Sequence, residues 1–135
     1  MNPEPAGAPS VSPEIHEAAP WTEVDRGVAR RLLVDSASVQ MVLYSISRRE
    51  HHPVHWHDAD QIGFIVRGSG RHRIGGVDVP FSTGDSYFVP RGTPHSFEPD
   101  PREEPVVILD LLVGPPELRN EHRPAPAGSS GDRVA

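Results

Sequence analysis

Short runs in which hydrophobic and polar residues alternate fill the middle of the chain. Runs of about four to eight residues with this period of two, or fully apolar runs between turn residues, are typical of β-strands. Apart from a possible first turn near Pro20–Val24, no segment has convincing helical periodicity. The pattern predicts strands at Ala29–Val34, Val39–Ser47, Gln61–Arg67, Gly70–Ile74, Val77–Phe81, Ser86–Val89 and Val106–Val113.

Glycine-rich turns separate these runs. Gly75 and Gly76 lie between two predicted strands, in a tight turn whose two central residues need positive φ. Residues 68–70 and 82–85 supply the flanking turns. The middle of the chain is therefore expected to form a series of hairpins in an all-β fold.

Composition favours one folded unit with two irregular ends. The 135 residues fit one domain, and 16 prolines with 12 glycines are too many for a helical bundle. Residues 1–20 are rich in Pro, Ala, Ser and Glu, and residues 119–135 are rich in Pro, Gly and Ser, so neither segment can bury much apolar area. We expect a disordered or draped arm at 1–20, the folded domain at 21–118 and a disordered tail at 119–135.

Charge and cysteine content exclude several kinds of chemistry and partner. Without cysteine the chain has no disulfide or thiolate, so a metal would bind nitrogen and oxygen atoms. The formal net charge of −6, with both signs interspersed, argues against a nucleic-acid partner. The chain has no run of about 20 apolar residues and no secretion signal, so we expect no membrane partner and a soluble, cytoplasmic protein.

Three histidines and a glutamine are the candidate metal ligands. His55 and His57 are two residues apart, so on a strand both imidazoles would face the same side, and Gln61 keeps that parity. His95 follows a later strand and a Pro-Arg-Gly turn. A lone His-x-His pair is weak evidence in a chain with eight histidines, and surface or packing roles are the alternative. Together the four residues predict a site for one divalent metal ion.

The segment from His55 to His95 resembles the cupin superfamily in both of its signature motifs. In the first motif His55, His57 and Gly68 match, whereas Arg49 replaces a glycine and Gln61 replaces the usual glutamate. The second motif is matched by Gly84, Pro90, Gly92 and His95, and Pro99 replaces an asparagine. The resemblance implies a single cupin barrel, that is, a double-stranded β-helix or jelly roll, which pairs through its sheets into a homodimer.

The amide at Gln61 affects the reaction that such a site would favour. An amide oxygen is neutral, so iron, manganese, nickel or zinc held by three imidazoles and an amide keeps its full positive charge. That ion would be a strong Lewis acid for isomerisation, cyclisation or elimination of a small oxygenated metabolite. An oxygen-dependent dioxygenase reaction is an alternative, since ferrous iron also binds three histidines. Gln61 could also only hydrogen-bond neighbouring strands.

Other polar residues are candidates for proton transfer. Asp110 lies within an apolar strand, where burial would raise its pKa towards that of a working acid or base. Tyr44 could supply a phenol, and Asp110 and Tyr44 are therefore the candidate catalytic residues; for Tyr87, as for Tyr44, packing is the alternative. His72 lies between two arginines and is expected to face solvent. His51 and His52 are expected in an exposed loop or a lid.

Two subfamily resemblances suggest different functions. Residues 61–63 and 109–112 resemble small pectin-degradation cupins with three His and one Gln, although Leu112 and Pro116 stand where those proteins have an aromatic residue and an Arg. Residues 55–63, 67–71 and 93–97 are similar to the sensing domains of arabinose-operon-type regulators, whose helix-turn-helix half is absent here. A metal-dependent enzyme is the main prediction; a metal-free sensor and a scaffold module are the alternatives.

Overall fold

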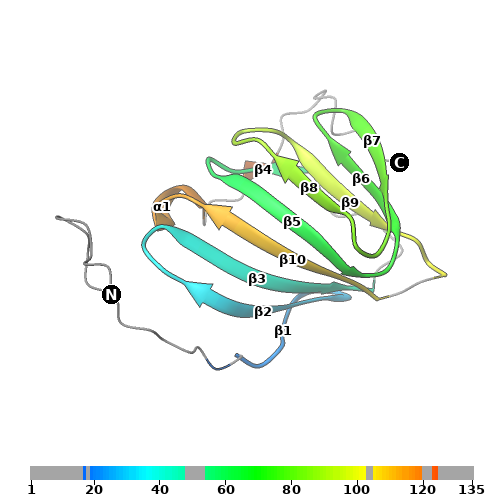
Figure 1. The fold of residues 1–135 in the computed structure, drawn as a ribbon, viewed down its shortest axis with the longest axis horizontal. Coiled ribbons are helices and arrows are strands. Elements are labelled where there is room, and N and C mark those ends of the chain that lie inside the picture. Colours follow the sequence, from blue (N-terminus) through cyan, green and yellow to red (C-terminus); the bar gives the residue numbers. More distant parts are fainter. Residues whose placement is uncertain (1–16, 18, 48–53, 103–104, 120–122, 125–135) are drawn as a thin grey trace, which may run out of the picture.

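The computed structural model describes residues 17, 19–47, 54–102, 105–119 and 123–124. Within these residues nearly all regular structure is strand, and the one short helix follows the last long strand (Figure 1). The elements are β1 (Thr22–Asp25), β2 (Val28–Asp35), β3 (Val39–Ile46), β4 (His55–Trp56), β5 (Asp60–Arg67), β6 (Gly70–Ile74), β7 (Val77–Phe81), β8 (Ser86–Val89), β9 (His95–Pro99), β10 (Val106–Val113), α1 (Pro116–Arg119) and β11 (Arg123–Pro124).

The strands form two sheets of the jelly-roll type. The first sheet has the order β1-β2-β3-β10-β5-β8 and the second has the order β11-β4-β9-β6-β7, with every pair antiparallel. The chain passes between the sheets after β3, β4, β5, β7, β8, β9 and β10, so residues far apart in the sequence lie side by side (Figure 1). The predicted all-β class is confirmed, as two sheets that remain open at their edges.

Most predicted strands have the predicted ends. The four strands at Gly70–Ile74, Val77–Phe81, Ser86–Val89 and Val106–Val113 match to the residue. The turn after β6 is also as predicted, because Gly75 and Gly76 have φ of 56° and 83°. The helical turn near Pro20–Val24 is wrong, since Thr22–Asp25 is β1 and pairs with β2.

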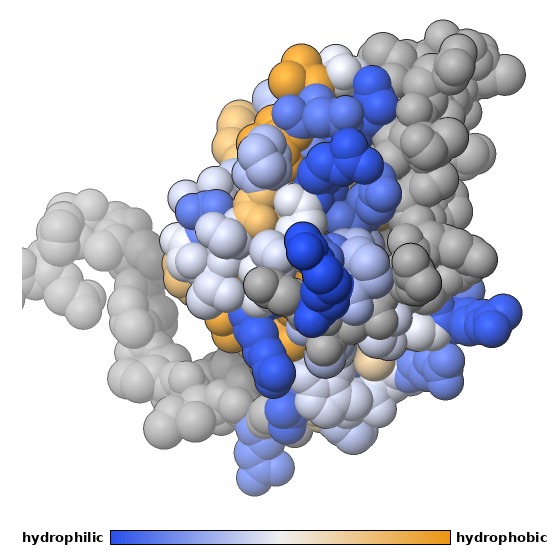
Figure 2. Space-filling view, turned by 90° about the vertical axis from the view of Figure 1, so that its right-hand side faces the viewer, coloured by the Kyte–Doolittle hydropathy of each residue, from blue (hydrophilic) through white to orange (hydrophobic). Residues whose placement is uncertain are grey.

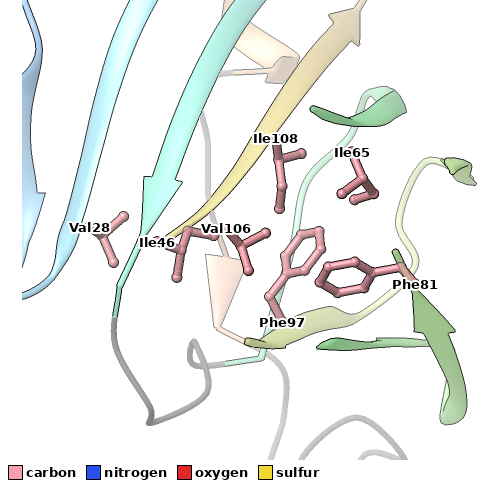
Figure 3. Close-up of a cluster of buried hydrophobic side chains, with 7 residues drawn as sticks. All are labelled: Val28, Ile46, Ile65, Phe81, Phe97, Val106 and Ile108. Carbon is pink, nitrogen blue, oxygen red and sulfur yellow. The ribbon is translucent and has the colours of Figure 1, made fainter. Parts of the chain in front are cut away.

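Alternating side chains of both sheets fill the interior. One cluster of buried residues, drawn in Figure 3, contains Val28, Ile46, Ile65, Phe81, Phe97, Val106 and Ile108. The Phe81 and Phe97 rings meet edge to face with their centroids 5.7 Å apart, a favoured aromatic geometry. Strand β10 supplies Val106 and Ile108 to this cluster, and its next inward residues are Asp110 and Leu112. The same strand thus connects the apolar core to the polar end of the interior.

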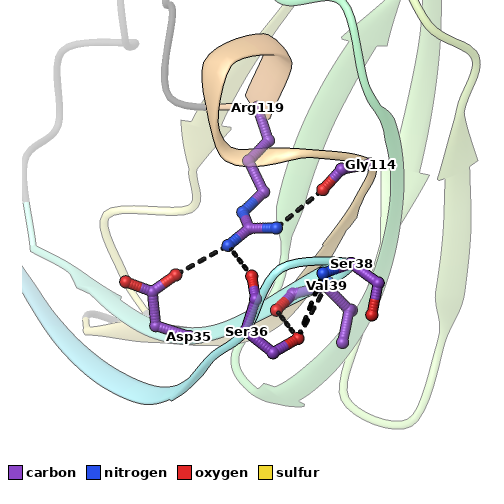
Figure 4. A network of polar contacts seen from close by, with 6 residues as sticks. All are labelled: Asp35, Ser36, Ser38, Val39, Gly114 and Arg119. Carbon is purple, nitrogen blue, oxygen red and sulfur yellow. Dashed lines mark hydrogen bonds and ion pairs between the residues drawn. The ribbon is translucent and has the colours of Figure 1, made fainter.

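A buried arginine fastens the segment after β10 to the first sheet. Arg119 in α1 is completely buried; its guanidinium donates to the Gly114 carbonyl at 2.6 Å, to Asp35 at 2.7 Å and to the Ser36 carbonyl (Figure 4). Farther along, β11 pairs with β4. The packed part of the chain therefore continues beyond the predicted boundary at Leu118.

Polar residues predominate on one side of the molecule. On the face shown in Figure 2, which is the right-hand side of Figure 1, hydrophilic residues are the most frequent among those coloured and hydrophobic residues lie between them. In the described part of the chain, no helix has the length and apolar character needed to cross a membrane.

Candidate metal centre and its acid–base partners

Three histidine rings come together at one end of the space between the sheets. His55 in β4 pairs directly with His95 in β9, and His57 follows β4 by one residue. One ring nitrogen from each histidine lies within 4.8 Å of the others. His57 and His95 are 2% and 1% exposed, so the cluster lies inside the protein and not on its surface. Imidazole nitrogens at this spacing are suited to a shared divalent cation.

Gln61 reaches the cluster from the opposite sheet. The sequence argument placed it on the same strand face as His55 and His57, and this part of the argument is wrong. Strand β4 ends at Trp56, the chain turns at residues 57–59, and Gln61 belongs to β5 of the first sheet. Its Oε1 nevertheless lies 2.8 Å from His57 Nε2. The four predicted ligands therefore meet across the two sheets.

The hydrogen bonds of His57 leave two acceptors facing each other. His57 Nδ1 lies 3.2 Å from the carbonyl oxygen of Ala59, which can only accept, so this nitrogen is the donor of that hydrogen bond. The other nitrogen, Nε2, lies 2.8 Å from the Gln61 Oε1. In the tautomer whose single proton is on Nδ1, both of these atoms present lone pairs, and a cation beside them would be bound by both. The donor set at His57 and Gln61 thus fits a bound metal ion.

His95 gives a second, independent indication of the same kind. Its Nδ1 donates to the Thr93 carbonyl at 2.8 Å, which leaves Nε2 as the acceptor nitrogen. This buried Nε2 has no hydrogen-bond partner among the described residues. Burial, and next the nearby His55, lower the pKa of His95 to about 2, so the ring is neutral at physiological pH. A neutral, buried and unsatisfied imidazole is in the state that metal coordination requires.

The orientation of the Gln61 amide is fixed by Asp110 and Tyr87, which lie on the side of the amide away from His57. Its amide group donates hydrogen bonds to the Asp110 carboxylate and to the Tyr87 phenol, and both bonds lower the pKa of the acceptor. Because the NH₂ group points to these two residues, the carbonyl oxygen points to His57. Asp110 and Tyr87 thereby select which end of Gln61 faces the histidines.

A row of residues across three strands brings Tyr87 to Asp110. Asp110 in β10 is paired with Gly63 in β5, and Gly63 is paired with Tyr87 in β8. The Tyr87 hydroxyl donates to Asp110 Oδ1 across the intervening glycine. A Cβ atom at Gly63 would lie 2.0 Å from Tyr87 Cζ, which is impossible without displacing the ring. Only glycine at residue 63 therefore permits this contact.

The environment tunes the acidities of this pair. Burial raises the pKa of Asp110 to about 6, although the hydrogen bonds from Tyr87 and Gln61 act in the opposite direction. Burial and the neighbouring Asp110 raise the pKa of Tyr87 well above its usual value. Asp110 can therefore gain or lose a proton near neutral pH while Tyr87 remains a hydrogen-bond donor.

Tyr44 lies beside Asp110 on β3, outside the row that Asp110, Gly63 and Tyr87 form across β10, β5 and β8. It is paired with Ile108 in β10, one inward position from Asp110, and it lines the same cavity. Burial and then Asp110 raise the pKa of the Tyr44 phenol, so it also stays protonated. The structure thus places both predicted proton-transfer residues at the site and adds Tyr87, for which the sequence favoured packing.

A cavity of about 410 Å³ connects these groups to the outside. Its volume is within the range of about 300–1,000 Å³ that is usual for small-molecule sites. The polar residues on its wall include the four candidate ligands and Asp110, and both sheets contribute to the lining. The arrangement can hold a small molecule against the histidine cluster with an acid–base group beside it.

His72 is a correction to the sequence analysis. It was expected to face solvent, but it is 1% exposed and stacks on Phe97 with the ring centroids 3.8 Å apart. In β6 the flanking Arg71 and Arg73 point outwards, so the alternation itself turns His72 inwards. Neither ring nitrogen has a hydrogen-bond partner among the described residues. His51 and His52 lie outside the described residues.

Comparisons with known proteins agree with this picture. The family model Cupin_2, described as a cupin domain, matches residues 42–112. The pectin degradation protein KdgF of Dickeya dadantii is 29% identical over 99 residues, covering 73% of this chain and 88% of that protein. The structure of KdgF from a Halomonas species has a TM-score of 0.66 and 24% identity, covering 73% of this chain and 90% of that one. An RmlC-like cupin from Shewanella frigidimarina has a TM-score of 0.65 and 22% identity, covering 76% and 86%.

Proposed function

The chain belongs to the cupin family, and on that premise we propose that it is a metal-dependent enzyme that isomerises, cyclises or eliminates from a small oxygenated metabolite. The observation that carries this proposal is that the candidate metal ligands and an acid–base residue lie next to each other in one cavity. The four candidate ligands His55, His57, His95 and Gln61, of which the buried His95 Nε2 has no hydrogen-bond partner among the described residues, lie next to Asp110, whose pKa is raised to about 6. A sensor or a scaffold needs no such acid–base group.

The four ligand residues would hold one divalent ion, which would supply Lewis-acid polarisation of a substrate oxygen. Asp110 would accept the proton that leaves the substrate and return it at another atom. Tyr87 and Gln61 hold the carboxylate by hydrogen bonds and act as positioning residues. Tyr44, which remains protonated, would donate a hydrogen bond to a substrate oxygen. The pectin-degradation role of the Dickeya relative supports chemistry on an oxygen-rich small molecule.

The test compares turnover by metal-free, metal-loaded and Asp110→Asn protein on a panel of unsaturated uronates and β-hydroxy acids. Asn has nearly the shape of Asp but no carboxyl proton to transfer, and the metal content of the variant, measured beside that of the wild type, checks that the ligand set is kept. We expect turnover only in the metal-loaded wild type, with a loss of about 10²-fold or more in the variant. Equal turnover with and without metal would contradict the proposal, and metal-independent ligand binding without turnover would favour the sensor.

For the assembly, we propose a homodimer formed through the outer face of the first sheet. Ile62, Phe64 and Val66 alternate along β5 and are 42–45% exposed, and Phe88 in the adjacent β8 is 54% exposed. Apolar side chains gathered on one sheet face favour a self-complementary contact. Light scattering should give a dimer for the wild type and a monomer for Phe64→Glu. Val77→Glu, on β7 of the other sheet, is the matched control and should remain dimeric.

A further inference from the structure

The cavity is longer than the metal centre requires. Along β3 the residues facing it are Val42, Tyr44 and Ile46, and Val42 is paired with Asp110. Ile46 lies four residues farther along the strand, a distance of about 13 Å. The cavity thus extends well away from the level of Asp110, towards the pair formed by Ile46 and Val28.

Apart from the exposed Asp25, which is paired with Val28 at the β1 edge, the far part of the cavity has an apolar lining. We call it the apolar lobe and define it by Val24, Val28, Ile46, Phe97 and Ile108. Val28, Ile46, Phe97 and Ile108 belong to the buried core, so the lobe is a space that the core leaves open on one side. Val24 lies in the edge strand β1, which forms the outer wall, and is 50% exposed.

Apolar walls beside a polar reaction centre favour a ligand with two unlike ends. Water in such a lobe would find few hydrogen-bond partners, and an alkyl or aryl group would replace it favourably. We infer that the substrate carries a hydrophobic alkyl or aryl group that lies in the apolar lobe while its oxygen atoms face the histidines. This inference rests on the proposed function for the position of the oxygens only. Leu112, at the other end of the cavity, adds a further apolar surface.

The first experiment needs no metal. Methyl NMR spectra of the metal-free protein are recorded during titration with 1-hexanol and, in parallel, with glycerol. We expect hexanol to shift the methyl signals of Val24, Val28, Ile46 and Ile108 saturably, and glycerol to leave them unchanged. Shifts that are absent from these four residues, or equal shifts with glycerol, would overturn the inference.

Two valine variants make this titration specific. Val24→Asp places a carboxylate at the wall of the lobe and should weaken hexanol binding by about fivefold or more. Val77→Asp changes a valine in β7 that is 62% exposed and does not line the cavity, and it should leave the affinity unchanged. Equal weakening by both variants would overturn the inference.

A second experiment separates the lobe from the metal centre. Calorimetry on Zn²⁺-loaded protein compares acetohydroxamate, a chelating head group, with hexanohydroxamate, which has the same head and four more methylenes. Because each buried methylene is worth about fourfold in affinity, we expect the longer probe to bind at least about tenfold more tightly. Equal affinities would overturn the apolar lobe. Failure of acetohydroxamate to bind would instead overturn the proposed metal centre. The hexanol titration would then still test whether the apolar lobe binds an alkyl group.

Discussion

The two ends of the interior differ in whether their side chains are held by packing or are polar groups that need hydrogen-bond or metal partners. At the core end, Phe81 and Phe97 pack against each other and have no polar side-chain atom to pair, although His72, which stacks on Phe97, has two ring nitrogens without a partner among the described residues. At the site end, His95 Nε2 has no partner among the described residues, and His57 Nε2 faces the oxygen of Gln61. Buried polar groups without partners destabilise a fold, and a metal ion bound by the cluster would supply the partner that His95 Nε2 lacks. The difference separates residues that maintain the fold from residues that serve the reaction.

The largest effect on stability should come from the core end. Phe97→Ala removes a ring that is 7% exposed and contacts Phe81 and His72. We expect a loss of about 3–5 kcal/mol in the free energy of unfolding, because the cavity cannot collapse fully. Urea unfolding of the metal-free protein measures this. His55→Ala, at the half-buried edge of the site, should cost much less; an equal cost would remove the contrast between the two ends.

Asp110→Asn should stabilise the metal-free protein in a pH-dependent way. Asp110 has a folded pKa of about 6, above its unfolded value, so between these two values the folded state binds more protons than the unfolded state. The wild type therefore loses stability as the pH rises through this window, whereas the variant does not. We expect an advantage of about 1–3 kcal/mol at pH 7.5 that disappears near pH 4. An advantage independent of pH would show that the carboxyl does not titrate as stated.

Gly63→Ala tests the row that joins Tyr87 to Asp110. The added Cβ would collide with the Tyr87 ring, so we expect a loss of about 1–3 kcal/mol in stability. The comparison is the same substitution in a Tyr87→Ala background, where there is no ring to displace and the cost should be small. Equal costs in both backgrounds would show that the glycine acts independently of Tyr87.

The smallest effect should come from His72→Phe. Burial, and next His55, lower the pKa of His72 to about 3, so below the unfolded pKa of 6.5 the folded state binds fewer protons and the wild type loses stability as the pH falls. Phenylalanine keeps the stacking on Phe97 and removes this titration. We expect the variant's advantage to grow by about 1–2 kcal/mol between pH 7 and pH 5. A constant difference over this range would contradict the account of His72.

Strand positions could be read from the sequence because each depends on local alternation and on turn residues such as Gly75 and Gly76. The histidines were found because two segments match the signature motifs of the cupin superfamily, since the His-x-His spacing alone is weak evidence. The contact of Tyr87 with Asp110 could not be read, because it depends on how three strands are aligned across Gly63, and strand register is a property of the whole sheet. The position of His72 could have been read, since its two arginine neighbours show the alternation. The buried Arg119 depends on carbonyl groups at the ends of two other strands, for which the sequence carries no local signal.

The central claim is that the histidine cluster is a metal centre and not merely a buried polar patch. The most direct measurement is the metal content per chain after reconstitution, determined for the wild type, His95→Ala and His72→Phe. His95 and His72 are both buried with an unsatisfied ring nitrogen, but only His95 belongs to the cluster. We predict about one equivalent of a divalent ion in the wild type and in His72→Phe, and none in His95→Ala. No bound ion in the wild type with iron, manganese, nickel or zinc, or equal metal content in all three proteins, would contradict the account.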